Sequence, residues 1–365
     1  MKVNFFDLKE QNDAVKDEVL VGLKEIIDKN QFVFGPKLDQ IEEEVAEYSG
    51  TKFAVALSSG TDALLVALMA LDLNIGDEVI TTPFTFFATV GTIVRSGATP
   101  VFVDIDPITF NIDPAEIEKK ITNNTKCIMP VHLYGQCANM KEINAIADKH
   151  GLKVIEDAAQ AIGAATGDKR AGSLSDIGCY SFFPTKNLGG FGDSGMAVTS
   201  DEALSKKIRQ LRNHGSERRY YHDYIGGNFR MDSFQAVSLS AKLKSLDTYI
   251  EKRRKNAALY HDLLAGVDGI ILPSENDGYL HTYNQYVIQT NRRDELKTFL
   301  QDNGVGSMIY YPLCLHEQPC LKYLGHNVGD FPVAEEISHN CLALPIFPEL
   351  KEDEIAYVAA KIKEF

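Results

Sequence analysis

Short apolar segments alternate with amphipathic helical segments between residues 53 and 200, and this order constrains the fold more than any other feature of the chain. The expected strands cover residues 53–57, 78–82, 100–104, 126–132 and 152–155. The expected helices between them include residues 61–71, 115–121 and 140–150. Strands that are joined by helices run parallel, and both faces of their sheet are covered. The order therefore predicts an α/β fold with a mostly parallel central sheet flanked by helices.

A long helical pattern over residues 233–264 separates this region from a second one with a different order. The following part is typical of an α+β module, with strands expected at 283–289 and 307–311 and helices at 293–303, 333–340 and 352–363. A chain of 365 residues can form one large and one smaller domain. We therefore expect a large domain over residues 1–250, which includes the N-terminal segment, and a small C-terminal α+β domain over residues 251–365.

The composition argues against several classes of partner. The formal net charge of −14 disfavours nucleic acid and anionic membrane surfaces, and no apolar run is long enough to span a bilayer. The six cysteines lack the paired spacing of a metal site, so we expect no metal. Several cysteines lie in apolar patterns, and the first residues show no signal-peptide pattern. These features predict a cytoplasmic protein with reduced thiols.

A glycine-rich loop follows the strand expected at residues 179–183, and it carries Lys186. Glycines allow the backbone of such a loop to approach a ligand closely. A lysine that is removed from water has a lowered pKa, and its neutral amine can attack an aldehyde. This is the chemistry by which a lysine holds pyridoxal 5'-phosphate (PLP). Taken alone, Lys186 would be interpreted as an ordinary loop lysine, but a second site supports the PLP hypothesis.

That second site is a pair of acidic residues, Glu156 and Asp157, after the strand expected at residues 152–155. Ligands of open α/β sheets bind outside the carboxyl ends of the strands. PLP needs a carboxylate facing its pyridine nitrogen, which keeps the nitrogen protonated and lets the ring accept electrons. Asp157 is the candidate for this role, and the alternative is that both acids begin a loop or cap a helix.

A turn of small residues joins the first expected strand to its helix. Backbone N–H groups at a helix N-terminus bind anions, so we assign the cofactor phosphate to Gly60 and Thr61, with the Ser181 hydroxyl as a further donor. A simple helix cap is compatible with this interpretation. Phe86, at the start of another helix, is the candidate for an aromatic side chain over the PLP ring, although a core position is the alternative.

In this order, the motifs resemble those of the DegT–DnrJ–StrS family of sugar aminotransferases, which are fold-type I PLP enzymes. The resemblance covers nearly the whole chain. The motifs that carry it include Phe34-Gly35-Pro36, Ser59-Gly60-Thr61-Asp62-Ala63-Leu64, Thr85-Phe86-Phe87-Ala88-Thr89, Tyr134-Gly135-Gln136, Glu156-Asp157-Ala158-Ala159-Gln160, Ser181-Phe182-Phe183-Pro184-Thr185-Lys186-Asn187-Leu188-Gly189 and Asn228-Phe229-Arg230-Met231-Asp232. The resemblance implies a PLP-dependent aminotransferase that passes through pyridoxamine 5'-phosphate.

The resemblance also implies a role for each cofactor residue. Lys186 would form the Schiff base with PLP and move protons to and from the substrate carbon. Asp157 would pair with the pyridinium nitrogen, and Gln160 would approach the ring hydroxyl. In this family the residue at the place of Asn228 reaches the phosphate from the neighbouring subunit, which implies a homodimer with two shared sites.

A substrate class follows from the same resemblance. Related dehydratases carry histidine in place of Lys186, and the run after it, Asn187-Leu188-Gly189-Gly190-Phe191-Gly192-Asp193, is similar to that of enzymes acting on 3-keto sugars. Ser194 departs from that group, which more often has glycine there. The resemblance implies transfer of an amino group from L-glutamate to a nucleotide-linked 3-keto sugar, closest to a UDP-2-acetamido-3-keto-hexose. The product would be a 3-amino sugar for lipopolysaccharide or another glycan.

Several alternatives stay open at this point. Within the family they are a dTDP-3-keto-6-deoxyhexose aminotransferase and an aminotransferase for a 4-keto sugar nucleotide. From other classes they are a non-catalytic regulatory or binding protein on the same fold, an amino-acid transaminase and a desulfurase. Candidate contacts with the sugar or the diphosphate are Tyr310, His316 and Arg230, each of which could equally be a structural loop residue.

Overall fold

The computed structural model describes residues 1–365, and its centre is a sheet of seven strands in the order β1-β9-β8-β5-β4-β2-β3. The neighbouring pairs from β8 to β3 run parallel, and β9 lies antiparallel between β1 and β8. The strands are β1 (Phe53–Leu57), β2 (Glu78–Thr81), β3 (Thr99–Phe102), β4 (Thr125–Ile128), β5 (Lys153–Asp157), β8 (Ile177–Ser181) and β9 (Gly195–Thr199). The predicted α/β fold with a mostly parallel sheet is confirmed.

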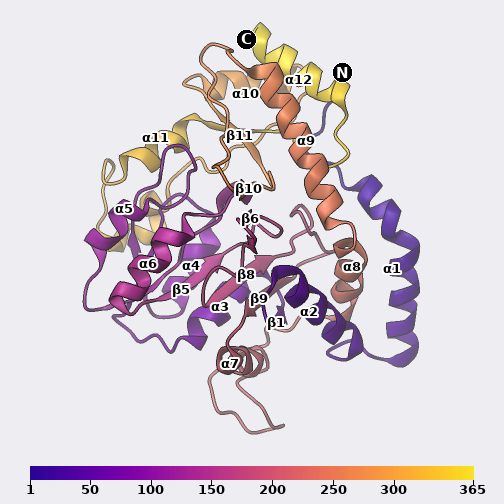
Figure 1. Ribbon diagram of the computed structural model, residues 1–365, viewed down its shortest axis with the longest axis vertical. Coiled ribbons are helices and arrows are strands. Elements are labelled where there is room, and N and C mark those ends of the chain that lie inside the picture. The colour runs from indigo at the N-terminus through magenta and orange to yellow at the C-terminus, as the bar shows by residue number, and fades with distance from the viewer.

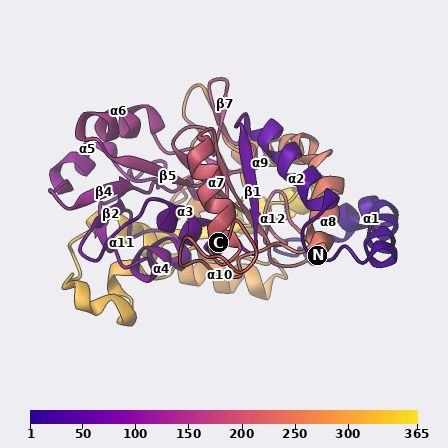
Figure 2. The ribbon, with the colours of Figure 1, turned by 90° about the horizontal axis from the view of Figure 1, so that it is seen from below.

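Helices cover both faces of this sheet (Figure 1 and Figure 2). Neighbouring side chains of a strand point to opposite faces, so each strand contributes to two cores. Val55 and Leu57 of β1 pack with α3, α4 and α7, whereas Ala54 and Ala56 pack with α2 and α8. The helices around the sheet are α1 (Lys9–Lys29), α2 (Pro36–Ser49), α3 (Gly60–Ala70), α4 (Phe87–Arg95), α5 (Pro114–Ile117), α6 (Met140–His150), α7 (Glu202–Arg212) and α8 (Ser233–Leu243). None of the helices combines the length and the hydropathy needed to cross a lipid bilayer.

A separate core forms around an antiparallel pair of strands, β11 (Tyr286–Gln289) and β12 (Cys341–Leu344). The other elements of this part are α9 (Leu246–Leu264), α10 (Arg293–Asp302), α11 (Pro332–Asn340) and α12 (Glu352–Glu364). Three very short strands, β6 (Ala165–Thr166), β7 (Lys169–Arg170) and β10 (Tyr279–Leu280), form a third sheet. Val3, near the N-terminus, also packs in the second core and pairs with Val305, and Ile362, near the C-terminus, belongs to the same core. Figure 1 shows both ends of the chain at the same end of the molecule.

Helix α9 connects the two cores, because Leu246 and Ile250 near its start belong to the first and Tyr260 and Leu264 near its end belong to the second. The predicted division at residue 250 falls within this helix and stays a prediction. Val3 packs in the second core, whereas α1 packs against α8, so the N-terminal segment contacts both parts of the molecule.

Two expected elements differ from the structure. The helix expected over residues 233–264 is two helices, because Lys244 and Ser245 interrupt it between α8 and α9. The strand expected at residues 307–311 is reduced to a single bridge between Met308 and Ala343. The chain leaves the second sheet there because the next two tyrosines line a cavity beside the first sheet.

A buried carboxylate fastens α2 and α7 to the edge strand β1. Glu42 Oε1 accepts hydrogen bonds from the backbone N–H of Ala56 at 2.9 Å and from Arg212 Nη1 at 2.5 Å. Its other oxygen accepts one from Arg209 Nη1 at 2.5 Å. Arg212 and Glu42 are both buried, so neither charge can be hydrated if the other is removed.

We predict that Glu42→Ala lowers the free energy of unfolding by about 3 kcal/mol, because it leaves the Arg212 guanidinium buried without its carboxylate. Chemical denaturation followed by circular dichroism would measure this. The matched control is Glu43→Ala, the same substitution at the next, exposed position of α2, which should change stability by less than about 0.5 kcal/mol. Equal losses in the two variants would contradict the prediction.

Candidate active site

A cavity of about 650 Å³ lies beyond the carboxyl ends of the strands, between the central sheet and the loop that precedes Pro312. Eight of the sequence-predicted residues line it: Gly60, Thr61, Phe86, Asp157, Gln160, Ser181, Lys186 and Tyr310. They come from five separate segments of the chain, and the parallel order of the strands brings their ends to one edge of the sheet. The cavity is therefore the candidate active site.

Lys186 lies in a tight turn that follows β8. Its backbone N–H donates to the carbonyl of Phe183 at 2.9 Å. A side chain at Gly189 would place its Cβ 2.1 Å from the carbonyl oxygen of Pro184, so only glycine allows the loop to close. The loop turns the lysine amine toward the cavity and away from bulk water. This desolvation lowers the pKa of Lys186 to about 8, and the nearby Asp157 charge partly opposes the shift.

Asp157 is the last residue of β5, and the residue is only 5% exposed. Its Oδ2 atom accepts a hydrogen bond from Thr89 Oγ1 at 2.8 Å, and its Oδ1 atom accepts one from the backbone N–H of Ala159 at 3.2 Å. Burial raises the pKa of Asp157, and no side chain forms an ion pair with it. A cation placed in the cavity against this carboxylate would offset the cost of its burial.

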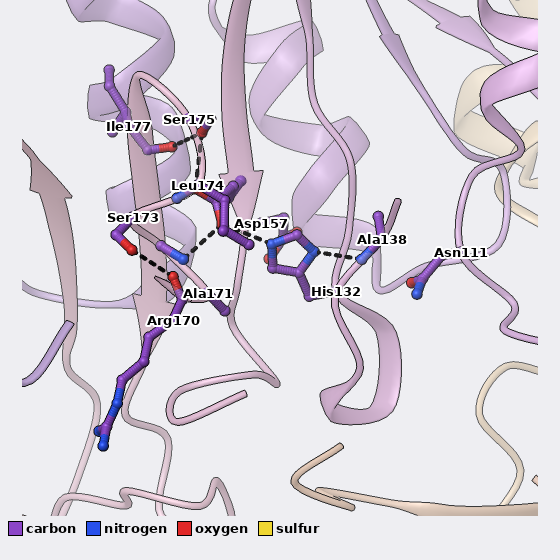
Figure 3. Close-up of polar contacts among 12 residues, drawn as sticks. Asn111, His132, Ala138, Asp157, Arg170, Ala171, Ser173, Leu174, Ser175 and Ile177 are labelled. Carbon is purple, nitrogen blue, oxygen red and sulfur yellow. Dashed lines mark hydrogen bonds and ion pairs between the residues drawn. The ribbon is translucent and has the colours of Figure 1, made fainter. Parts of the chain in front are cut away.

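The neighbouring acid, Glu156, has a structural role on the opposite face of the strand. His132 Nδ1 accepts from the backbone N–H of Ala138 at 3.1 Å (Figure 3). The proton of the ring therefore lies on Nε2, which donates to Glu156 Oε2 at 2.8 Å. The same carboxylate accepts from three donors of the following loop, Gly172, Leu174 and Ser175. His132 therefore has a structural role in this arrangement.

The phosphate cradle predicted around α3 has the geometry of an anion site. Ser59 is the N-cap of α3, and its Oγ accepts from the N–H of Asp62 at 3.0 Å. A side chain at Gly60 would place its Cβ 2.6 Å from Ser181 Cβ, so the end of β8 lies directly against the first turn of the helix. Free backbone N–H groups and the hydroxyls of Thr61 and Ser181 therefore face one part of the cavity.

Gln160 is held at the rim between the two parts of the molecule. Its Oε1 accepts from the backbone N–H of Tyr134 at 2.7 Å, and its Nε2 donates to the Tyr311 hydroxyl at 3.1 Å. Phe86 is 58% exposed, and its ring centroid lies 6.3 Å from that of Tyr311. Phe86 therefore lines the mouth of the cavity and is not a core residue.

Sequence reasoning missed Tyr311 and Thr89, although both touch residues that it named. Tyr311 stands beside the predicted Tyr310, and the pair of tyrosines before Pro312 was the available signal. Thr89 lies one helical turn after Thr85, and their hydroxyl oxygens are 3.0 Å apart. Threonines with this spacing at the start of an apolar helix were a signal for a polar contact.

Three predicted residues do not line this cavity. His316 is buried, and its Nε2 contacts Glu335 Oε1 at 3.1 Å, so a sugar contact for it finds no support here. Arg230 donates to Asn213 Oδ1 at 2.8 Å and is partly buried. Asn228 is exposed at the surface.

A family model for the DegT/DnrJ/EryC1/StrS aminotransferases matches residues 13–363. A "Pleiotropic regulatory protein" of Geobacillus stearothermophilus is 50% identical over 100% of this chain and 99% of its own length. A UDP-N-acetyl-3-dehydro-α-D-glucosamine 3-aminotransferase of Acidithiobacillus ferrooxidans is 48% identical over 98% of this chain and 96% of its own. The crystal structure of Streptomyces venezuelae DesV with a ketimine intermediate has a TM-score of 0.97 at 38% identity, covering 100% and 98% of the two chains.

The chain therefore belongs to the DegT/DnrJ/EryC1/StrS aminotransferase family. It is an aminotransferase with PLP as its cofactor, as the sequence predicted. The cavity fits this cofactor, because it presents a desolvated lysine, a buried carboxylate without a cation and an anion cradle at a helix N-terminus. When bound, PLP supplies an electron sink and carries the amino group between substrates. Lys186, Asp157 and the residues around Gly60 would hold it.

We predict that the apoprotein captures PLP faster as the pH rises, with a midpoint near pH 8, because only the neutral Lys186 amine attacks the aldehyde. The pKa is lowered, so the neutral form is present above pH 8 and is lost below it. The rate at which the visible absorption band of bound PLP appears would measure this. Asp157→Asn should move the midpoint to lower pH, because the carboxylate raises the pKa of Lys186. A midpoint near the ordinary lysine value of 10.5 would count against the assignment.

Proposed function

We propose that the chain transfers the amino group of L-glutamate to the 3-keto carbon of a UDP-linked 2-acetamido-3-keto-hexose. The product is a 3-amino sugar for lipopolysaccharide or another glycan. The observation that carries this proposal is the 48% identity with the Acidithiobacillus 3-aminotransferase over 358 residues. The cavity supports it, because the lysine, the carboxylate and the anion cradle needed for amino transfer face the same space.

The reaction balances without a further reactant. L-glutamate loses its amino group and two electrons and leaves as 2-oxoglutarate. The keto carbon of the sugar gains the amino group and the two electrons, so that the ketone becomes an amine. Lys186 takes the proton from the α-carbon of glutamate and later gives a proton to carbon 3 of the sugar. Asp157 would stabilise a positive charge on the cofactor ring. Gln160, which the backbone N–H of Tyr134 holds in place, would approach the ring hydroxyl. Phe86 covers the cavity mouth and limits the access of water.

Tyr310 and Arg230 are the substrate contacts that we retain as proposals. Tyr310 lines the cavity from the loop before Pro312 and can reach a sugar in it. Arg230 lies beside Asn228 and carries the positive charge that a diphosphate needs. We place the enzyme in the cytoplasm, where its six free cysteines would stay reduced.

The surface around the cavity supports a homodimer with shared sites. Phe183 and Phe191, on either side of Lys186, are 49% and 46% exposed, and Phe86 at the cavity mouth is also exposed. Apolar side chains gathered in this way mark a surface that another protein covers. Asn228 and Arg230 do not reach the cavity of their own subunit, so we assign them to the site of the partner. Each site would then consist of residues from two chains.

A regulatory role is the second candidate, because a relative with 50% identity carries a regulatory name. A binding protein on this fold has no need for a desolvated lysine that faces a buried carboxylate. Lys186 and Asp157 are both present and line the same cavity. This favours catalysis, whether or not the protein also regulates another process.

The first test follows the visible spectrum of the purified enzyme with bound PLP. We expect the band of lysine-bound PLP to disappear on addition of L-glutamate, and to return when the UDP-linked 2-acetamido-3-keto sugar is added. The control is Lys186→Arg, which keeps a cation but cannot bind the aldehyde and should show no such band.

The outcomes separate the candidates. Return of the band only with a dTDP-linked 3-keto-6-deoxy sugar, or with a 4-keto sugar, would replace the proposed acceptor and keep the reaction type. A band that glutamate leaves unchanged would exclude glutamate as the donor. Absence of the band after addition of PLP would support the regulatory candidate.

A second test addresses the shared sites. We predict that Lys186→Ala and Asn228→Ala subunits, each of low activity alone, recover about a quarter of the normal activity after mixing and exchange. Half of the dimers are then mixed, and one of their two sites has both Lys186 and Asn228 intact. If Asn228 serves its own subunit, no mixed site is intact and mixing restores nothing. Size-exclusion chromatography with light scattering would measure the dimer directly.

A further inference from the structure

Helix α8 packs behind the loop of residues 186–193, which we call the lysine loop. Gln235 Oε1 accepts a hydrogen bond from the backbone N–H of Phe191 at 3.0 Å. Lys242 Nζ donates to the carbonyl oxygen of Gly189 at 2.9 Å. Gln235 and Lys242 are seven residues apart, so they lie on one face of the helix two turns from each other. Two side chains of α8 thus form hydrogen bonds with backbone groups of the lysine loop.

Two glycines of the lysine loop lie directly against the Gln235 side chain. A Cβ at Gly190 would lie 2.9 Å from Gln235 Oε1, and a Cβ at Gly192 would lie 2.9 Å from Gln235 Nε2. Leu188 of the loop is fully buried in the same core as Ala236 and Leu239 of α8. The loop therefore packs directly against the helix, and its position depends on where α8 lies.

The burial of Lys242 costs free energy, because it removes a cation from water. Its side chain is only 3% exposed, and no carboxylate lies within ion-pair distance. Its polar partner is the carbonyl of Gly189, and the Phe191 ring centroid lies 4.7 Å from Nζ. Burial lowers the pKa of Lys242 to about 8. An apolar side chain of similar length would fill the space without removing a cation from water, so packing alone does not explain a lysine here.

The same helix is also connected to the phosphate cradle. The segment that leads into α8 runs along the end of β1, where the carbonyl of Phe229 accepts from the N–H of Ser58 at 2.9 Å. Arg230 forms an antiparallel β-bridge with Leu57. Leu57 lies two residues before Ser59, the N-cap of α3. Helix α8 and its leading segment therefore contact both the lysine loop and the start of the anion site.

We propose that Gln235 and Lys242 are positioning residues that hold the lysine loop, and through it the Lys186 amine, in the orientation that reacts with PLP. This inference rests on the proposal that Lys186 is the lysine that binds PLP. The two side chains act through the backbone of Gly189 and Phe191, and neither residue lines the cavity. Their removal should slow the capture of PLP by the apoprotein and the turnover of the enzyme together.

The test compares Lys242→Met with Lys244→Met, the same substitution two residues further along at an exposed position. We expect Lys242→Met to lower the rate of PLP capture and kcat about ten-fold, because a small displacement of a reacting group has a large effect on rate. The KM values should stay within about two-fold, since substrate contacts are unchanged. The melting temperature of the apoprotein should fall by no more than about 3 °C, because the lost hydrogen bond is offset by the removal of a buried cation. Lys242→Arg, which keeps a donor, should recover part of the rate.

Gln235→Leu is the second variant, and it should slow PLP capture in the same way because Phe191 N–H loses its acceptor. Unchanged capture rates in folded Lys242→Met and Gln235→Leu proteins would overturn the inference, as would a fall in stability without a change in rate. Reductive trapping of bound PLP with borohydride, followed by peptide mass spectrometry, tests the assignment of Lys186 separately from the positioning role. PLP on another lysine in the unmodified protein would refute the assignment of Lys186, whereas PLP on Lys186 with equal rates in all variants would refute only the positioning role.

Discussion

The amine of Lys186 and the carboxylate of Asp157 share one cavity because β5 and β8 are parallel neighbours that end at the same edge of the sheet. Asp157 pairs with Cys179 of β8, and the lysine loop follows the end of β8. Burial acts on the two groups in opposite directions, since it lowers the pKa of the lysine and raises that of the acid. Each charge moderates the shift of the other. A positively charged ring nitrogen bound against Asp157 would take over the role of cation there. The lysine is then free to be neutral, as its reaction with an aldehyde requires.

This arrangement depends on supports that lie outside the cavity. On one side, Glu156 accepts four hydrogen bonds from His132 and the following loop, which fixes the strand that carries Asp157. On the other side, α8 holds the backbone of the lysine loop through Gln235 and Lys242. A reacting pair is useful only if both members keep their orientation, so buried polar contacts behind them are part of the site.

The second part of the molecule completes the cavity. Tyr311 belongs to no strand of the central sheet. It nevertheless contacts Gln160, which lies 151 positions earlier in the sequence, and its ring lies beside that of Phe86. Helix α9 joins the two cores, and its two ends belong to different ones. Tyr310 and Tyr311 pack against a further cluster that contains Phe84 of the first part and Val287 of the second, and this packing places them beside the central sheet.

The sequence by itself determined the α/β order, the strand ends that carry Gly60, Asp157 and Lys186, and the glycine-rich lysine loop. These features are local, because periodicity, turn residues and the position of a residue after a strand depend on neighbours in the chain. Only the tertiary structure decided which side chains meet from distant segments. Thr89 and Asp157 are 68 positions apart, and Lys242 and Gly189 are 53 apart, so no pattern in either segment indicates the contact. His316 is a further example, because the sequence suggested a sugar contact for it. Its burial and its contact with Glu335 follow from tertiary packing, which the sequence pattern does not indicate.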